Sequence, residues 1–171
     1  MKKGIIILIA VLAFVPMSFA QKIGHVDLQA VTDSLPSMKG ANKELESYQA
    51  EQTKVIEDMA KALENDYQIY LTEQDSLSPI IRDMKEKKFL ERQQEIAYKQ
   101  QQLEQDLQTL YTRLFTPIQD RLDKAVAVVA EKEGIVYVLE KTQLLYTGAG
   151  GVDLTAQVRE EMIKSEPGAG N

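Results

Sequence analysis

The chain contains no cysteine and a single histidine among its 171 residues. Without cysteine, a disulfide scaffold and thiol chemistry are both excluded, so packing or assembly must supply the stability. Nucleophilic catalysis needs a nucleophile beside a base, and the lone His25 falls in a short predicted strand, where a structural role is the default. The carboxylates are spread along predicted helices without converging His or Cys partners. These absences predict a protein that is not an enzyme and holds no metal or cofactor.

Basic residues are also scarce. Without Lys2 and Lys3 of the predicted leader, 18 basic residues remain against 26 acidic ones, a net charge of −8. Phosphate contacts need clustered Lys and Arg, so this balance excludes nucleic acid as a partner. The glycine-rich stretch from Gly148 to Gly151 lacks the Lys and Ser or Thr of a phosphate-binding loop and is predicted to be a turn.

Only the N-terminus carries a long apolar run. Residues 1–20 combine a positive head, an apolar stretch from Gly4 to Val15 and the small residues Ser18 and Ala20, which is the layout of a secretory signal peptide cleaved after Ala20. The alternative is a membrane anchor, but the run is short for a span and is interrupted by Pro16. Since no later run is long enough to cross a bilayer, the mature protein is expected to be exported without stable membrane insertion.

Two long helices are predicted between Pro36 and Thr116, with a break at residues 75–79. Proline and glycine are nearly absent from both segments, and Glu, Gln, Lys and Ala dominate them. Seven-residue spacing of apolar side chains suits a coiled-coil seam. In the second helix this row consists of Phe89, Ile96, Leu103 and Leu110.

The second seam position of this helix holds leucine near the root and glutamine further out. Leu107 and Leu114 give way to Gln93 and Gln100 toward the break. Each large side chain that is not buried forgoes about 1.5–3 kcal/mol, so a loose outer half is expected. The basic segment near the break should lie beside Glu64, Asp66, Glu73 and Asp75 and form solvated ion pairs of little individual value.

Pro117 lies inside the continuing helical pattern and predicts a kink, which we interpret as a hinge. The helix should end at Gly134. Residues 22–26 predict a strand, and the runs 135–139 and 143–147 predict a β-hairpin. Asp153 to Thr155 should cap a last helix that ends near Lys164, and the residues after it should be disordered.

The sequence therefore predicts an α+β fold that is mostly α-helical. A signal peptide occupies residues 1–20, a body is formed by residues 21–35 and 117–166, a helical hairpin arm covers 36–116, and a disordered tail covers 167–171. A body of this size with so few strands is marginal alone. Oligomerisation is expected through residues of the strand-bearing base, namely Ile23, Val26, Val136, Val138, Leu144 and Tyr146.

The arm has more large apolar side chains than a two-helix seam can bury, and the surplus must meet other copies or a ligand. Any one of these residues is by default an ordinary seam residue. The candidate binding residues are Met59, Leu63, Tyr67, Tyr70, Phe89, Ile96 and Tyr98, together with the basic residues Arg82, Lys85 and Lys88.

Several segments resemble the Skp/OmpH family of periplasmic chaperones. Residues 22–27 resemble its first strand, Pro117 to Gly134 its descending arm, and residues 136–139, 144–146 and 153–155 its strand pair and closing helix. The resemblance implies a homotrimer with a small β-rich body and three helical-hairpin tentacles in the periplasm. It also implies an ATP-independent holdase that keeps unfolded outer-membrane proteins soluble. The best-known members look basic, so capture by this acidic chain should depend more on apolar contact.

Two other interpretations remain open from the sequence. The first is a periplasmic hairpin adaptor that docks its tip, with Leu77 as an essential residue, on a fixed partner. The second is an envelope spacer without a client. The polar outer seam favours the holdase over a rigid adaptor.

Overall fold

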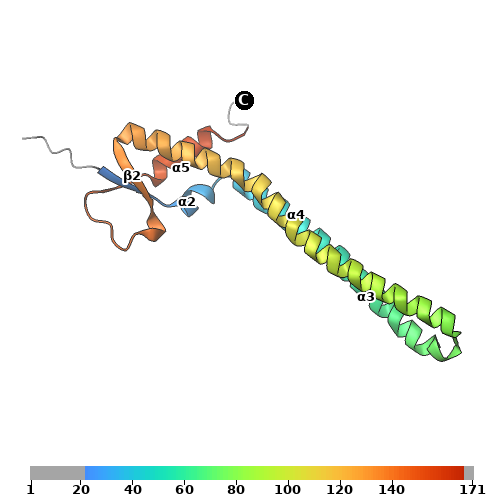
Figure 1. Cartoon of the computed structure of the whole chain (residues 1–171). Helices are drawn as coiled ribbons and strands as arrows, with labels where there is room; N and C mark the ends of the chain where they lie inside the picture. The colour runs from blue at the N-terminus through green and yellow to red at the C-terminus, as the bar shows by residue number, and fades with distance from the viewer. Residues whose placement is uncertain (1–21, 168–171) are drawn as a thin grey trace, which may run out of the picture.

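The computed structural model describes residues 22–167. The predicted signal peptide and residues 168–171 of the predicted tail lie outside the described residues. The described chain consists of a small body at one end and a long helical hairpin that projects from it (Figure 1). The predicted fold class, a mostly helical α+β chain with a small sheet and a long hairpin, is confirmed.

The hairpin consists of α3 (Pro36–Glu73) and the outer part of α4 (Pro79–Glu133), joined by the 3-10 turn η1 (Gln74–Ser76). A proline opens each helix, where its missing N–H would have had no partner. The Ser78 Oγ also caps α4 by accepting the Ile81 N–H at 3.4 Å. With 38 residues in α3, the arm is about 57 Å long at 1.5 Å per residue. The two predicted arms and the break between them are present.

Helix α4 continues through Pro117 without interruption and enters the body. The helix is continuous at Pro117, and the predicted hinge there stays a prediction that the helix bends at this residue. The helix ends where Gly134 adopts a left-handed conformation, with φ of 64°, and the Gly134 N–H bonds to the carbonyl oxygens of Ala130 and Glu131.

The sheet has three parallel-paired strands in the order β2-β1-β3. Strand β1 (Lys22–Val26) lies between β2 (Ile135–Glu140) and β3 (Gly151–Asp153). The predicted β-hairpin is wrong. After β2 the chain forms the 3-10 turn η2 (Lys141–Gln143), and residues 144–147 form no strand. The predicted turn at Gly148 to Gly151 is present, with the Gly151 N–H donating to the Gly148 carbonyl oxygen at 3.0 Å. The third strand begins at its last residue, Gly151, and continues to Asp153 along the free edge of β1, where Gly24 pairs with Val152.

The core of the body lies between the sheet and three helices. From α5 (Thr155–Lys164), Val158 and Met162 are fully buried against α4 and against the short helix α2 (Leu28–Thr32). Gly24 permits this packing, because a Cβ there would lie 2.7 Å from Leu154 Cδ1. The other members of the core cluster are Val26, Val31, Leu35, Ala41, Ile118, Leu122, Ala125, Val129, Ile135 and Leu154.

The prediction of disorder directly after α5 is wrong for its first two residues. The Ser165 Oγ donates to the carbonyl oxygen of Met162 at 2.9 Å. The Glu166 side chain reaches across to the beginning of α3, where it accepts a hydrogen bond from the Ser37 backbone N–H at 3.0 Å. The C-terminal segment is thus tied to the root of the arm.

Candidate functional site

The two helices of the arm are joined by polar contacts at intervals along its length. Near the root, the Tyr48 hydroxyl donates to Asp106 at 3.2 Å, and Arg113 pairs with Glu44 at 3.0 Å. Desolvation is the larger cause, and the hydrogen bond to Asp106 the second, of the raised pKa of Tyr48. These contacts link α3 to α4 across the seam.

An aromatic cluster closes the seam in the outer third of the arm. The ring of Phe89 lies 5.4 Å, between centroids, from each of Tyr67 and Tyr70, in edge-on geometries that suit aromatic pairs. Tyr70 is only 3% exposed, and its hydroxyl donates to Glu86 at 2.6 Å. This hydrogen bond is the larger cause, and burial the second, of the raised pKa of Tyr70. Aromatic side chains therefore pack across the seam in the outer half, where the sequence predicted a loose seam.

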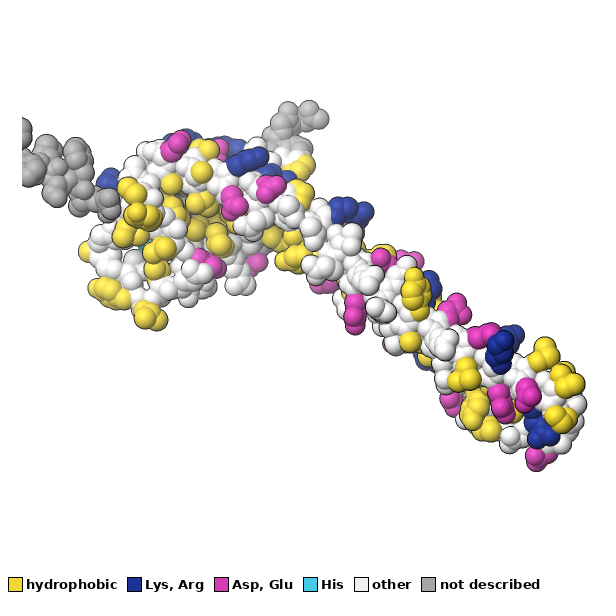
Figure 2. Space-filling view, in the orientation of Figure 1, with side chains coloured by type: hydrophobic (Ala, Val, Ile, Leu, Met, Phe, Trp, Pro, Cys, Tyr) yellow, Lys and Arg dark blue, Asp and Glu magenta, His cyan; other side chains and the backbone are white. Residues whose placement is uncertain are grey.

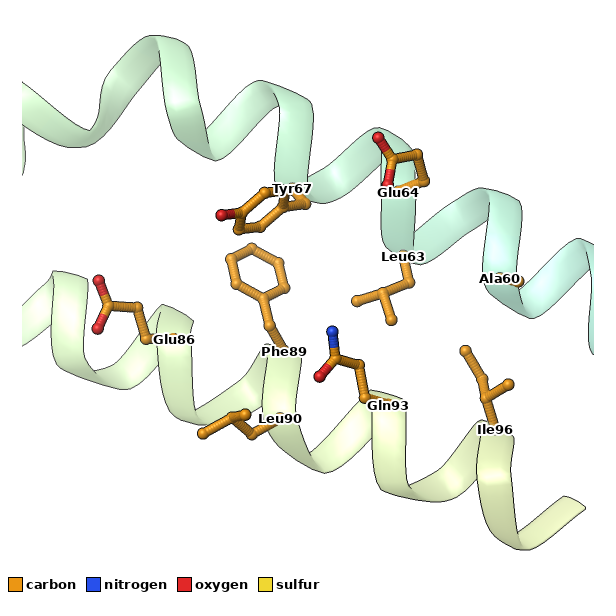
Figure 3. Close-up of a pocket in the computed structure, with 9 residues that line it drawn as sticks. All are labelled: Ala60, Leu63, Glu64, Tyr67, Glu86, Phe89, Leu90, Gln93 and Ile96. Carbon is orange, nitrogen blue, oxygen red and sulfur yellow. The ribbon is translucent and has the colours of Figure 1, made fainter.

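Between this cluster and the root, the helices leave an apolar hollow of about 560 Å³ (Figure 3). Leu63 and Tyr67 line it from α3, and Phe89, Leu90 and Ile96 line it from α4. We call this hollow the arm groove. The remaining residues of the arm groove are Ala60, Glu64, Glu86 and Gln93.

The arm groove occurs where the sequence places glutamine at a seam position. Gln93 and Gln100 are both exposed, as the polar seam predicts, so no large side chain fills the space between the helices. The side chain of Leu90 remains 60% exposed at the edge of the groove. The arrangement can accept an apolar group from another molecule, since burying one large aliphatic side chain contributes about 1.5–3 kcal/mol.

The candidate binding residues are not all equally accessible. Leu63, Tyr67, Phe89 and Ile96 meet in the arm groove. Tyr70 supports the aromatic cluster from a buried position. Outside the groove lining, Met59 is half-buried and Tyr98 is exposed.

The basic candidates are partly neutralised by neighbouring acids. Lys85 pairs with Glu73 at 3.5 Å, and Arg92 pairs with Asp66, as the predicted antiparallel register requires. Arg82 is half-buried, whereas Lys88 is exposed. Lys88 lines a second hollow of about 180 Å³ together with Lys85, Asp66, Ile69, Phe89 and Arg92.

Sequence reasoning missed an apolar surface at the tip. Ile80 is 72% exposed and Met84 is 63% exposed, one turn further along α4. Figure 2 shows hydrophobic side chains gathered at this tip and again on the body. The sequence did carry a signal for this surface, because Ile80 and Met84 are four residues apart and therefore share one face of the helix that Pro79 opens. The other exposed apolar residues near the tip are Ile69, Leu71 and Ile81.

The predicted oligomerisation residues occupy three kinds of position in the body. Ile23, Val136 and Tyr146 are exposed, and Val138 and Leu144 are half-buried. Val26 faces the core of its own chain. The edge strand β2 also exposes Tyr137 and Leu139, and the segment after it exposes Leu145. Sequence analysis missed these last three residues.

Within residues 22–167 no group of three or more His, Cys, Asp and Glu side chains is placed to hold a metal ion. Over the same residues, no helix has both the length and the hydropathy of a membrane span. His25 lies 3.7 Å from Asp153 at the sheet. The pKa of Asp153 is lowered chiefly by hydrogen bonds from Thr155.

A long helical hairpin that projects from a small sheet body, with a hollow between its helices, is the architecture of this chain. The family model described as "Outer membrane protein (OmpH-like)" matches residues 22–162. The chain belongs to this family, which confirms the resemblance drawn from the sequence.

Two relatives carry the name "Chaperone protein Skp". The protein from Pectobacterium atrosepticum is 26% identical over 143 residues, which cover 84% of this chain and 86% of that protein. The protein from Photorhabdus luminescens is 25% identical over the same length and the same shares. The family is chaperone-type rather than enzymatic.

Proposed function

We propose that this protein is an ATP-independent holdase of the periplasm that binds unfolded outer-membrane proteins and prevents their aggregation. The arm groove carries the proposal, because it offers an unfilled apolar space on an arm that stands clear of the body. Membership of a chaperone-type family supports the same conclusion.

Binding by the arm groove would be weak for each side chain and reversible. A single aliphatic or aromatic group of a client would gain only a few kcal/mol from burial against Leu63, Phe89 and Ile96. The exposed apolar residues of the tip would add further contacts of the same kind. Several weak contacts hold an unfolded chain without nucleotide hydrolysis, and each can be released separately.

Electrostatics would contribute less than apolar contact. The net charge of −8 after removal of the leader opposes strong capture of acidic clients. Lys85 and Arg92 already have acidic partners, and exposed pairs of this kind contribute little. Arg82 and Lys88 remain the candidates for a contact with a client carboxylate.

The holdase is proposed to act as a homotrimer in which three arms surround the client. The support is the edge strand β2, which exposes Val136, Tyr137 and Leu139, because an exposed apolar edge strand invites pairing with another chain. The mass of the mature protein by light scattering tests this. Val136→Asp should shift that mass to the monomer, and an unchanged mass would contradict this interface.

Export is proposed to depend on the signal peptide at residues 1–20, with cleavage after Ala20. Mass spectrometry of the protein isolated from the periplasm should give Gln21 as the first residue. A protein that retains Met1 would contradict cleavage.

The proposal is tested by diluting a urea-unfolded outer-membrane β-barrel into buffer with an excess of the chain and following light scattering. Suppressed scattering is expected. Leu90→Asn should weaken the suppression, because it makes an exposed edge of the arm groove polar. Ile163→Asn is the matched control, since Ile163 is similarly exposed on α5, away from the groove. Full aggregation at a threefold excess of chain would reject the holdase.

The exposed tip also supports the second candidate, a periplasmic hairpin adaptor that docks on a fixed partner. Leu77 is half-buried, so Ile80 and Met84 are the better test residues. Ile80→Asp with Met84→Asp should abolish docking by an adaptor but leave most of the aggregation suppression by a holdase. Loss of docking in this variant, from a chain that never suppressed aggregation, would favour the adaptor. Loss of suppression in this variant, with suppression by Leu90→Asn unchanged, would instead place client binding at the tip.

A further inference from the structure

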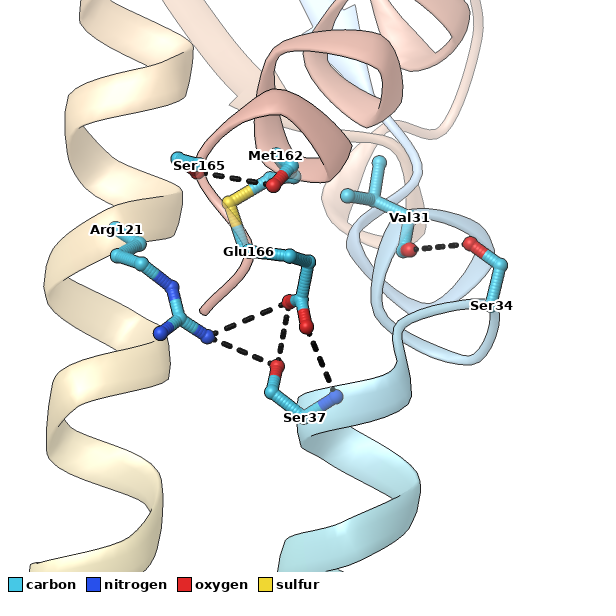
Figure 4. Close-up of polar contacts among 7 residues, drawn as sticks. All are labelled: Val31, Ser34, Ser37, Arg121, Met162, Ser165 and Glu166. Carbon is cyan, nitrogen blue, oxygen red and sulfur yellow. Dashed lines mark hydrogen bonds and ion pairs between the residues drawn. The ribbon is translucent and has the colours of Figure 1, made fainter. Parts of the chain in front are cut away.

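Three segments of the chain meet in a small polar cluster where the arm joins the body (Figure 4). The Glu166 carboxylate accepts hydrogen bonds from the Ser37 backbone N–H at 3.0 Å and from the Ser37 Oγ at 2.6 Å. Arg121 of α4 lies 3.4 Å from the same carboxylate and donates to the Ser37 Oγ at 2.8 Å. Each of the three residues therefore touches the other two.

The first turn of α3 is suited to a carboxylate. Pro36 and Ser37 open the helix, and the first amides of a helix have no partner within it. No side chain caps this helix from the residue before it, Leu35. The partial positive charge of the helix N-terminus and the guanidinium of Arg121 both favour an anion there.

The turn after α5 holds Glu166 in place. The Ser165 N–H and Oγ both donate to the carbonyl oxygen of Met162, at 3.1 and 2.9 Å. The Glu166 N–H donates to the Ile163 carbonyl oxygen at 3.3 Å. This turn directs the Glu166 side chain toward Ser37 (Figure 4).

The cluster is largely withdrawn from solvent. The side chain of Glu166 is 9% exposed and that of Arg121 is 20% exposed. A carboxylate at this depth needs its hydrogen bonds, since an unpaired buried charge is strongly unfavourable. By contrast, the pair of Glu160 with Lys164 on α5 is exposed on both sides.

We propose that Ser37 and Arg121 form a carboxylate-binding site whose ligand is Glu166 of the same chain, and that its occupancy restricts the swing of the arm against the body. The family match ends at residue 162, so the ligand lies beyond the matched part of the chain, whereas Ser37 and Arg121 lie within it. The inference does not depend on what the arm binds.

The restriction follows from the position of the cluster along α4. This helix runs from the arm deep into the body, so a swing of the arm bends it. Pro117, where the backbone hydrogen bonding of a helix is weakest, lies four residues, about one turn, before Arg121. Glu166 ties α3 to α4 directly on the body side of that point. An empty site would leave the beginning of α3 held to the body by its apolar contacts, at Leu35 and Ala41, without this polar tie.

The test uses the absence of cysteine from the chain. Spin labels on Gln94→Cys in the arm and Gln157→Cys in the body, both exposed positions, report the arm-to-body distance by pulsed electron resonance. Labelled chains are diluted with unlabelled ones, so that each distance lies within one chain. The variants are Glu166→Gln and a chain that ends at Lys164, and Glu160→Gln is the matched control.

Both variants should broaden the distance distribution, and the control should not. Hydrogen exchange of the Ser37 amide should also accelerate by roughly tenfold or more, because its hydrogen bond to a charged group is lost. An unchanged distribution in both variants would overturn the proposal. Faster exchange without broadening would overturn it as well, since the cluster would then only stabilise the fold. Melting curves confirm that the variants are folded.

Discussion

Replacing Phe89 with alanine should loosen the outer arm without disturbing the body. Phe89 makes both of the 5.4 Å aromatic contacts to Tyr67 and Tyr70. Truncation of a core phenylalanine costs about 3–5 kcal/mol, but Phe89 is only half-buried. We therefore expect about 2–3 kcal/mol in the free energy of local opening. At 1.4 kcal/mol for each factor of ten, the open population should rise roughly 30- to 140-fold.

Hydrogen exchange resolved along the chain measures this effect, because local opening is read separately for each segment. Amides of residues 63–93 should exchange faster, whereas those of the core helix segment from Ile118 to Val129 should keep their protection. Leu90→Ala is the matched control, since Leu90 is adjacent but largely exposed, and it should change exchange little. Equal acceleration in arm and body would refute the reasoning, because the two parts would then unfold as one unit. Unchanged exchange in the arm would refute the role of the aromatic cluster.

Three further predictions concern single residues. The hydrogen bond to Glu86 and burial raise the pKa of Tyr70, so the folded protein keeps this proton to a higher pH than the unfolded chain does. The free energy of unfolding should therefore fall as the pH rises above 10.0, and it should fall less in Tyr70→Phe. Urea unfolding at each pH measures both. The pKa of Asp153 is lowered in the folded protein, so its ionised carboxylate stabilises the fold at neutral pH. This stabilisation is lost as the pH falls below 3.8, and the loss should be smaller in Asp153→Asn. Leu154→Ala, at a fully buried position, should cost about 2–5 kcal/mol, and a melting temperature equal to that of the unaltered chain would contradict its place in the core.

The helical arm could be predicted from the sequence because its signals are local. The row from Phe89 to Leu110 repeats every seven residues, and Pro79 and Gly134 mark a helix start and a helix end that need no tertiary information. The glutamines of the outer seam predicted sparse packing there, and one of them, Gln93, lines the arm groove.

The sheet could not be predicted from the same kind of signal. The apolar run from Leu144 to Tyr146 has the composition of a strand, yet residues 144–147 form none. The short stretch Gly151–Asp153 pairs with β1 because the edge of that strand lies beside it in the folded body, and this pairing joins segments more than a hundred residues apart. Parallel pairing of this kind depends on tertiary position. The aromatic cluster was missed for a related reason, since Tyr67 and Phe89 meet only because of how α3 and α4 are rotated toward each other (Figure 3).

The central position of β1 sets an order of events for a chain made from its N-terminus. This strand comes first among the described residues, yet both of its neighbours follow the whole hairpin. The hairpin closes through contacts between nearby segments, and local contacts form fast, whereas distant pairings are slow. The body must wait until residue 153 is available. The arm should thus exist, with its apolar surfaces, before the body is complete, and a nascent chain would expose these surfaces first to its own later segments.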